Sequence, residues 1–326
     1  PGRTLPGITL DGTDQGQFVA GGTRRVSENV DMFGENVYDL FGQHAALTQR
    51  YGVDYRATSA LTLGGAIEYG TIRDDSGDFD RLAPSLSLDY TDGDRISSHA
   101  RLEYRRDRGE VSGTSRDQDI FLFLASGSYK LDDEKRLLFG FEYADNDVPA
   151  NAVMTGKYID GSIGYAIRPV LDDRFNMLVQ YRYLYDMVGQ DIDGSATRGP
   201  RQQSHVFSID AEYDISQNWT LGGKLGLRLS NSAPDDATAL ARNDAWLTVM
   251  NGRYHVNKRW DLLLEGRYFQ AQQADIGEFG LLAAGYRQVG QNLKLGAGYN
   301  FGRFSDDLTD LTLDDKGLFI NLIAKF

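Results

Sequence analysis

The sequence has no cysteine, only seven prolines among 326 residues, and no apolar run approaching 18 residues. The absence of cysteine is compatible with an oxidising compartment, where a stray thiol is a liability. The lack of a long apolar run excludes a membrane-spanning helix. It does not exclude a membrane-spanning β-barrel, because only every second residue of a barrel strand faces lipid.

Basic residues are also in short supply. The chain carries 34 Lys and Arg against 47 Asp and Glu, a formal charge of −13. No basic stripe is present to neutralise phosphates, so the sequence argues against nucleic acid as a partner. Composition does not change after about residue 45, so we expect a single domain over 1–326, in which 1–44 form N-terminal strands or a plug.

The segment 209–229 shows what the chain has in place of long apolar runs. Apolar and polar residues alternate on both sides of a short polar turn at 216–218. The apolar side carries Ile209, Ala211, Tyr213, Ile215, Trp219, Leu221, Leu225, Leu227 and Leu229. A period of two over this length predicts a β-hairpin with one apolar face.

The same unit recurs along the chain, with a tyrosine before each short turn. These tyrosines are Tyr55, Tyr90, Tyr129, Tyr165, Tyr213, Tyr254 and Tyr286. Longer polar connections separate the units, for example 71–81, 106–119 and 186–204. Short turns that alternate with long loops are typical of outer-membrane barrels, which have short periplasmic turns and longer external loops.

A second set of aromatic residues ends the returning strands, at Tyr69, Tyr104, Tyr143, Tyr183, Tyr268 and Tyr299. The apolar stripe that leads from a turn to these tyrosines spans eight positions, as from Leu61 to Tyr69 or from Trp260 to Tyr268, which gives an apolar band about 20 Å tall for a tilted strand. Tyrosines at both edges of such a band predict interfacial aromatic girdles. A soluble β-sandwich or propeller also alternates, but neither explains tyrosines at both ends of the apolar stripe.

The C-terminal segment GLFINLIAKF places Leu318, Ile320, Leu322 and Phe326 on one face and ends on the aromatic residue. It resembles the ending of outer-membrane β-barrel proteins of Gram-negative bacteria. The longer ending from residue 298 resembles the C-terminal barrels of large, repeat-containing bacterial surface proteins. The resemblance implies a bacterial outer-membrane location, an assembly signal in the last strand, and partners that comprise outer-membrane lipids, lipopolysaccharide, the barrel assembly machinery and other envelope or surface proteins.

The units predict a transmembrane antiparallel up-and-down β-barrel of eighteen strands, with sixteen as the alternative. Fifteen strands follow residue 45, and 31–39 supplies a sixteenth. The segment 16–25 and an edge strand over 3–10 bring the number to eighteen, an even number that places both chain ends on one side. A barrel of this size encloses more space than one layer of side chains fills, so we expect a wet or plugged lumen.

The polar side of the strands predicts the inner wall. Its charged candidates are Arg101, Glu103, Arg105, Glu142, Arg182, Asp210, Glu212, Lys224, Arg228, Glu265, Arg267, Arg287 and Lys294. Both signs are interspersed. Such a wall fits a water-filled pore with a transverse field, and equally a set of ion pairs that makes a polar interior tolerable.

Chemistry other than passage has little support in the sequence. The four histidines are dispersed and bring no nucleophile, base and orienting group together, so we expect no enzymatic activity and no metal site. No cofactor is expected. The acidic segments 74–80 and 306–315 offer carboxylates for Ca²⁺ or Mg²⁺, although their spacing matches no EF-hand loop.

Two functions remain open. The first is a membrane anchor, and a passage, for a larger surface protein or envelope assembly. It is motivated by the missing initiator methionine at Pro1, which suggests a mature form or a piece of something longer. The second is a free-standing diffusion channel of the porin type, or an exporter, with a mixed-charge lumen.

Overall fold

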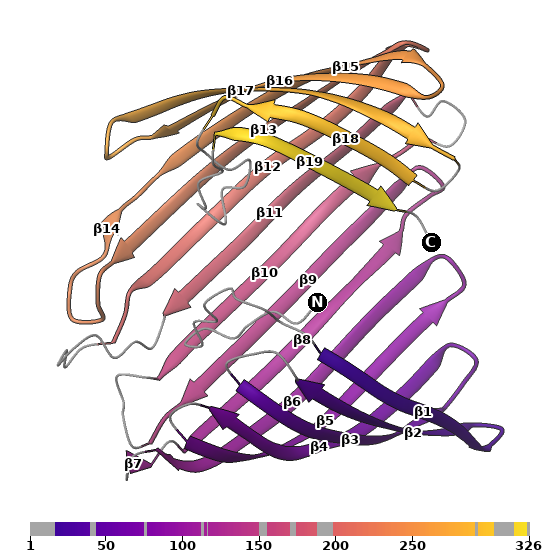
Figure 1. Ribbon diagram of the computed structural model, residues 1–326, viewed down its shortest axis with the longest axis vertical. Helices are drawn as coiled ribbons and strands as arrows, with labels where there is room; N and C mark the ends of the chain where they lie inside the picture. Colours follow the sequence, from indigo (N-terminus) through magenta and orange to yellow (C-terminus); the bar gives the residue numbers. More distant parts are fainter. Residues whose placement is uncertain are drawn as a thin grey trace.

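The computed structural model describes residues 17–39, 44–74, 77–111, 114–115, 117–149, 155–169, 174–187, 198–290, 293–302 and 316–324. Strands make up the regular structure of these segments (Figure 1). No helix among them is long and apolar enough to cross a membrane.

The strands of the N-terminal half are β1 (Gln17–Ser27), β2 (Val30–Asp39), β3 (His44–Arg56), β4 (Leu61–Asp74), β5 (Gly77–Asp92), β6 (Ile96–Val111), β7 (Thr114–Ser115), β8 (Gln118–Lys130) and β9 (Lys135–Asp147). Those of the C-terminal half are β10 (Gly156–Ile167), β11 (Phe175–Met187), β12 (Arg201–Ser216), β13 (Trp219–Ala233), β14 (Ala241–Arg242), β15 (Ala245–Asn257), β16 (Trp260–Ala271), β17 (Ile276–Val289), β18 (Leu293–Asn300) and β19 (Gly317–Ala324).

Each long strand pairs antiparallel with the next long strand in the chain. The two-residue strands β7 and β14 pair with β6 and β13 respectively. Apart from β7, which pairs with β6 alone, eighteen strands form one continuous, strongly curved sheet (Figure 1). The predicted all-β, antiparallel up-and-down architecture of eighteen strands is confirmed.

The edges of the described sheet are β1 and β19, and they run in the same direction. This follows because the long strands alternate in direction and seventeen of them are described. Closing the sheet with antiparallel pairs alone therefore requires one further strand of opposite direction between β1 and β19. The sequence predicts such a strand over 3–10, which lies outside the described residues.

The connections at one end of the sheet are tight. Residues 28–29, 217–218 and 258–259 form two-residue turns, and Gly93 and Gly290 have the positive φ angles, 55° and 71°, that other turns at this end require. At the other end of the sheet, away from the tight turns, the strands extend beyond the bounds that the sequence predicts. The segment 71–81 is mostly strand, because polar side chains continue the pairing: the Thr71 hydroxyl donates to Asp80 Oδ1 at 2.8 Å.

Candidate functional site: the inner wall of the sheet

The two faces of the sheet differ in composition along every long strand. On β13, Leu225 is 56% exposed and lies opposite Ile209 of β12, while its neighbour Lys224 lies opposite Asp210 on the other face. We call the face of Leu225 the outer face and the face of Lys224 the inner wall. Large apolar side chains dominate the outer face and are exposed there, which is the pattern of a surface in contact with lipid.

The cross-strand register places the predicted lumen residues. Arg101, Glu103, Arg105, Glu142, Arg182, Asp210, Glu212, Lys224, Arg228, Glu265, Arg267 and Lys294 all lie on the inner wall. The remaining candidate, Arg287, does not.

Arg287 and Tyr286 exchange the positions that the sequence predicts. Arg287 lies opposite Trp260 on the outer face, with its guanidinium 5.4 Å from the centre of the indole ring, so it is not a lumen residue. Tyr286 lies on the inner wall over Gly296, with the Lys294 ammonium 5.2 Å from its ring centre. The register with β16 decides the faces of β17, and a phase error of one residue reverses both side chains.

The other predicted girdle tyrosines lie on the outer face. Tyr55, Tyr90, Tyr129, Tyr165, Tyr213 and Tyr254 are near the tight turns, and Tyr69, Tyr104, Tyr143, Tyr183, Tyr268 and Tyr299 are towards the opposite ends of their strands. Several stack with neighbours, such as Tyr254 with Trp219 at 4.8 Å between ring centres. Their role as interfacial anchors stays a prediction.

Ion pairs neutralise much of the inner wall. Glu103, only 5% exposed, accepts hydrogen bonds from Arg101 and from Arg105, the latter at 2.9 Å. Arg81 pairs with Asp107 through two hydrogen bonds of 2.9 Å each. Such forked guanidinium–carboxylate pairs fix both side chains and leave little net charge at the wall.

An apolar patch on the inner wall is the feature that our sequence analysis missed. Val206, Ala245, Leu247 and Val249 form a buried cluster against Phe269, and Leu247 is 1% exposed. A signal was present: residues 245–250 read AWLTVM, in which apolar residues occupy both faces of the strand. On this strand the inner-facing Leu247 and Val249 are buried, whereas the outer-facing Met250 is 71% exposed.

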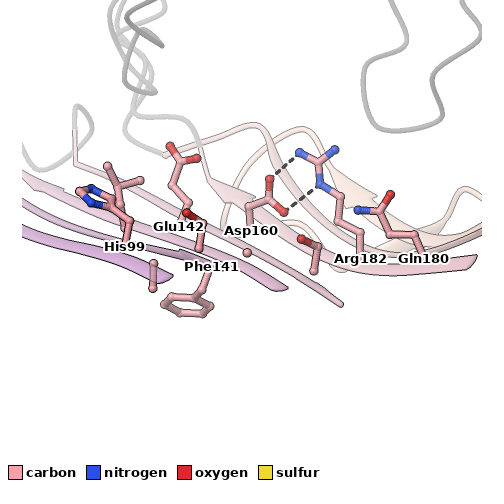
Figure 2. A pocket seen from close by; sticks show the side chains of 11 residues that line it. His99, Phe141, Glu142, Asp160, Gln180 and Arg182 are labelled. Carbon is pink, nitrogen blue, oxygen red and sulfur yellow. Dashed lines mark hydrogen bonds and ion pairs between the residues drawn. The ribbon is translucent and has the colours of Figure 1, made fainter. Parts of the chain in front are cut away.

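A hollow of about 450 Å³ lies on the inner wall where β6, β8, β9, β10 and β11 adjoin. His99, Glu142, Asp160, Gln180 and Arg182 project into it (Figure 2), together with Ser126, Ser162 and Leu124. Phe141, whose backbone contributes to the floor, points to the other side of the sheet (Figure 2). Arg182 donates from Nε to Asp160 Oδ1 at 2.8 Å and from Nη2 to Oδ2.

Near the tight turns, one histidine does meet a carboxylate and a hydroxyl. His255 Nδ1 lies 2.7 Å from Asp261 Oδ1, and His255 Nε2 lies 3.1 Å from Thr220 Oγ1. The Thr220 hydroxyl, however, donates its hydrogen to Asp214. Its oxygen therefore accepts from Nε2, which leaves the imidazole no free nitrogen to act as a base for that hydroxyl.

The described part of the chain contains no group of three or more His, Asp or Glu side chains placed to hold a metal ion. Within the acidic segment 74–80, Asp80 accepts a hydrogen bond from Thr71, and residues 75–76 lie outside the description. The segment 306–315 lies entirely outside it.

At the tight-turn rim, surface carboxylates are stabilised in their charged form. Lys130 Nζ donates to Asp94 Oδ2 at 2.5 Å and holds the pKa of that carboxyl below its ordinary value. The Glu134 backbone N–H, which donates to Asp132 Oδ1 at 2.9 Å, likewise lowers the pKa of Asp132. The first contact ties the end of β8 to the β5–β6 turn, and the second lies within the β8–β9 turn.

The last strand carries the predicted assembly residues. Leu318, Ile320 and Leu322 lie on the outer face of the edge strand β19 and are 85%, 86% and 62% exposed. Phe326 lies outside the described residues. Recognition of this strand by the assembly machinery stays a prediction.

No protein-family model and no curated protein matches the sequence. Several solved structures, in contrast, are similar to the chain. The chain is similar to the ferric-catecholate import receptor Fiu from E. coli (10% identity, TM-score 0.58, 86% of this chain and 60% of that one), to the alcaligin outer-membrane receptor FauA from Bordetella pertussis (12%, 0.57, 88% and 58%) and to the FrpB iron transporter from Neisseria meningitidis (13%, 0.56, 94% and 62%).

These likenesses show the fold of the chain, which is that of bacterial outer-membrane β-barrels. The chain spans about 60% of the length of the receptors that it matches. An outer-membrane location follows from this fold together with the exposed apolar outer face.

Proposed function

We propose that this protein is an outer-membrane β-barrel whose lumen passes small hydrophilic solutes. The observation that carries the proposal is the polar hollow on an inner wall whose charges are paired with one another. Paired charges allow a wetted wall with little net field, and this suits solutes of low charge. The similar solved structures include an import receptor and an iron transporter, which supports a role in transport.

The experiment is single-channel recording of the purified, refolded chain in a planar lipid bilayer. We expect a steady open conductance with weak ion selectivity. A protein that inserts correctly but remains silent would contradict a passage. We also propose a non-enzymatic role, since the Thr220 hydroxyl, which lies beside the His255–Asp261 pair, already donates its hydrogen bond to Asp214.

A membrane anchor for a larger surface protein is the second candidate. It is favoured by the buried apolar patch of Val206, Ala245, Leu247 and Val249, because apolar side chains on an inner wall are unfavourable in a fully water-filled lumen. A silent but inserted barrel in the recording above would support this anchor. Outer-membrane lipids and lipopolysaccharide at the outer face, the assembly machinery at β19, and an envelope or surface protein are the proposed partners.

A further inference from the structure

A row of polar positions crosses the floor of the hollow. Ser126 of β8, Gly140 of β9 and Ser162 of β10 lie directly opposite one another on successive strands. The row continues to His99 of β6 at one end and to Arg182 of β11 at the other. It spans five strands, so at about 4.8 Å per strand it is roughly 19 Å long.

Gly140 gives this row its depth. A Cβ atom at position 140 would lie 2.9 Å from Ser162 Oγ, so any side chain there would fill the floor between the two serine hydroxyls. On the neighbouring strand, Gly161 occupies the outer face, where a Cβ atom would meet only Phe141 Cδ2, at 3.6 Å. Gly140 therefore leaves space on the inner wall, and Gly161 leaves space on the outer face.

Carboxylates line the next row along the strands. Glu142 lies directly opposite Asp160. Asp160 is fixed by the forked contact with Arg182 and by the Tyr158 hydroxyl, which donates to Asp160 Oδ2 at 3.2 Å. The pairing orients the carboxylate and the guanidinium side by side, so that acceptors and donors face the same space.

The donor set selects the class of solute. The negative charges of Glu142 and Asp160 would repel an anionic group in the hollow. His99 also lines the hollow, but the described part of the chain contains no group of three such side chains placed to hold a metal ion. A neutral molecule with many hydroxyls satisfies the mixed set, because each hydroxyl both donates to a carboxylate and accepts from serine, Gln180 or Arg182. Leu124 adds an apolar surface for C–H groups.

We infer that this hollow binds a neutral, polyhydroxylated solute of the saccharide class on its path through the lumen. The inference rests on the proposed passage and names the solute class for it. The volume of about 450 Å³ lies within the range of small-molecule sites.

The test is equilibrium dialysis of labelled maltotriose, a neutral trisaccharide, against the refolded full chain in detergent micelles. Trigalacturonate serves as the anionic counterpart. We expect saturable binding of maltotriose and at least about tenfold weaker binding of trigalacturonate, since like charges placed close together across an interface cost at least about this much. Absence of maltotriose binding, or equal binding of both sugars, would overturn the inference.

Gly140→Leu fills the floor and should abolish maltotriose binding, whereas Gly161→Leu adds the same side chain to the outer face and should leave it unchanged. If the first variant does not fold, the double variant Ser126→Ala and Ser162→Ala removes the hydroxyls without adding bulk and should weaken binding about tenfold. Unchanged binding in the double variant, or equal loss in both leucine variants, would contradict the site.

Glu142→Gln gives a second, independent readout, because it should reduce the preference for maltotriose over trigalacturonate. An unaltered preference would contradict the role assigned to the carboxylate. Dialysis does not need an open pore. Binding without conductance therefore overturns the passage alone, and conductance without binding overturns the saccharide inference alone.

Discussion

The outer face and the inner wall of the sheet are built from alternate residues of the same strands, yet they obey different rules. The outer face is predominantly apolar: Leu221, Leu225 and Leu227 on β13 lie opposite Tyr213, Ile209 and Phe207 on β12. The inner wall is divided. Over β8–β11 it carries glycine, serine and forked ion pairs around a hollow, and over β12–β16 it carries a buried apolar patch. The outer face is apolar because it contacts lipid, whereas the inner wall accommodates polar, charged and apolar side chains in different regions.

The largest difference between the two faces is expected when a charge is introduced on the outer face of β13 and when a charge is reversed on its inner face. Leu225→Arg should lower the free energy of unfolding by about 2–4 kcal/mol if the side chain lies near the bilayer midplane. Lys224→Glu on the inner wall should have a mild effect. Urea unfolding of the refolded barrel in lipid vesicles measures both, and equal tolerance of the two substitutions would refute the assignment of faces.

A cavity substitution distinguishes the apolar patch from the lipid face. Leu247→Ala should cost about 2–3 kcal/mol, because Leu247 is 1% exposed and packs within the cluster around Phe269. Leu225→Ala, at 56% exposure, should cost less than half of that. The same unfolding assay applies. Similar costs would mean that the patch is not packed.

An aromatic truncation tests the tight-turn rim of the outer face. Trp219→Ala removes the ring that lies 4.8 Å from Tyr254, and it should cost roughly 1 kcal/mol. The control is Trp219→Phe, which keeps a ring and should recover most of the loss. No recovery by phenylalanine would argue against ring contact as the cause.

The smallest expected effect is electrostatic and depends on pH. The pKa values of Asp94 and Asp132 are lowered in the folded protein, so their contribution to stability is present above the ordinary carboxyl pKa of about 4 and is lost as the pH falls through the lowered pKa of the folded state. Asp94→Asn should therefore lower the thermal midpoint slightly at pH 7, and this difference should shrink as the pH falls below about 4. A difference that does not shrink on acidification would argue against the ion pair with Lys130.

Periodicity alone predicts much of the fold, because period-two alternation is a local property of each strand. It does not fix the phase of a strand such as β17, where one phase carries Phe279 and Leu281 and the other carries Leu282 and Tyr286. Pairing with β16 selects the phase, so Tyr286 turns inward and Arg287 outward. That choice depends on residues distant in the sequence.

The candidate site is less predictable for a similar reason. The charges of the inner wall follow from the alternation, but the hollow depends on Ser126, Gly140 and Ser162 becoming cross-strand neighbours. These residues are separated by 14 and 22 positions in the chain, and no local pattern aligns them. The apolar patch was visible in residues 245–250, but only as a departure from alternation.

The most direct test of the central claim uses the natural absence of cysteine. Single cysteines placed in turn at each position from 221 to 229 report which face of β13 reaches water, when the refolded barrel in lipid vesicles is treated with a charged, membrane-impermeant thiol reagent. We predict fast labelling at 222 and 224, slower labelling at the buried positions 226 and 228, and none at 221, 223, 225, 227 and 229. Uniform labelling, or labelling of the odd positions, would contradict a lipid-facing outer surface around a wetted lumen.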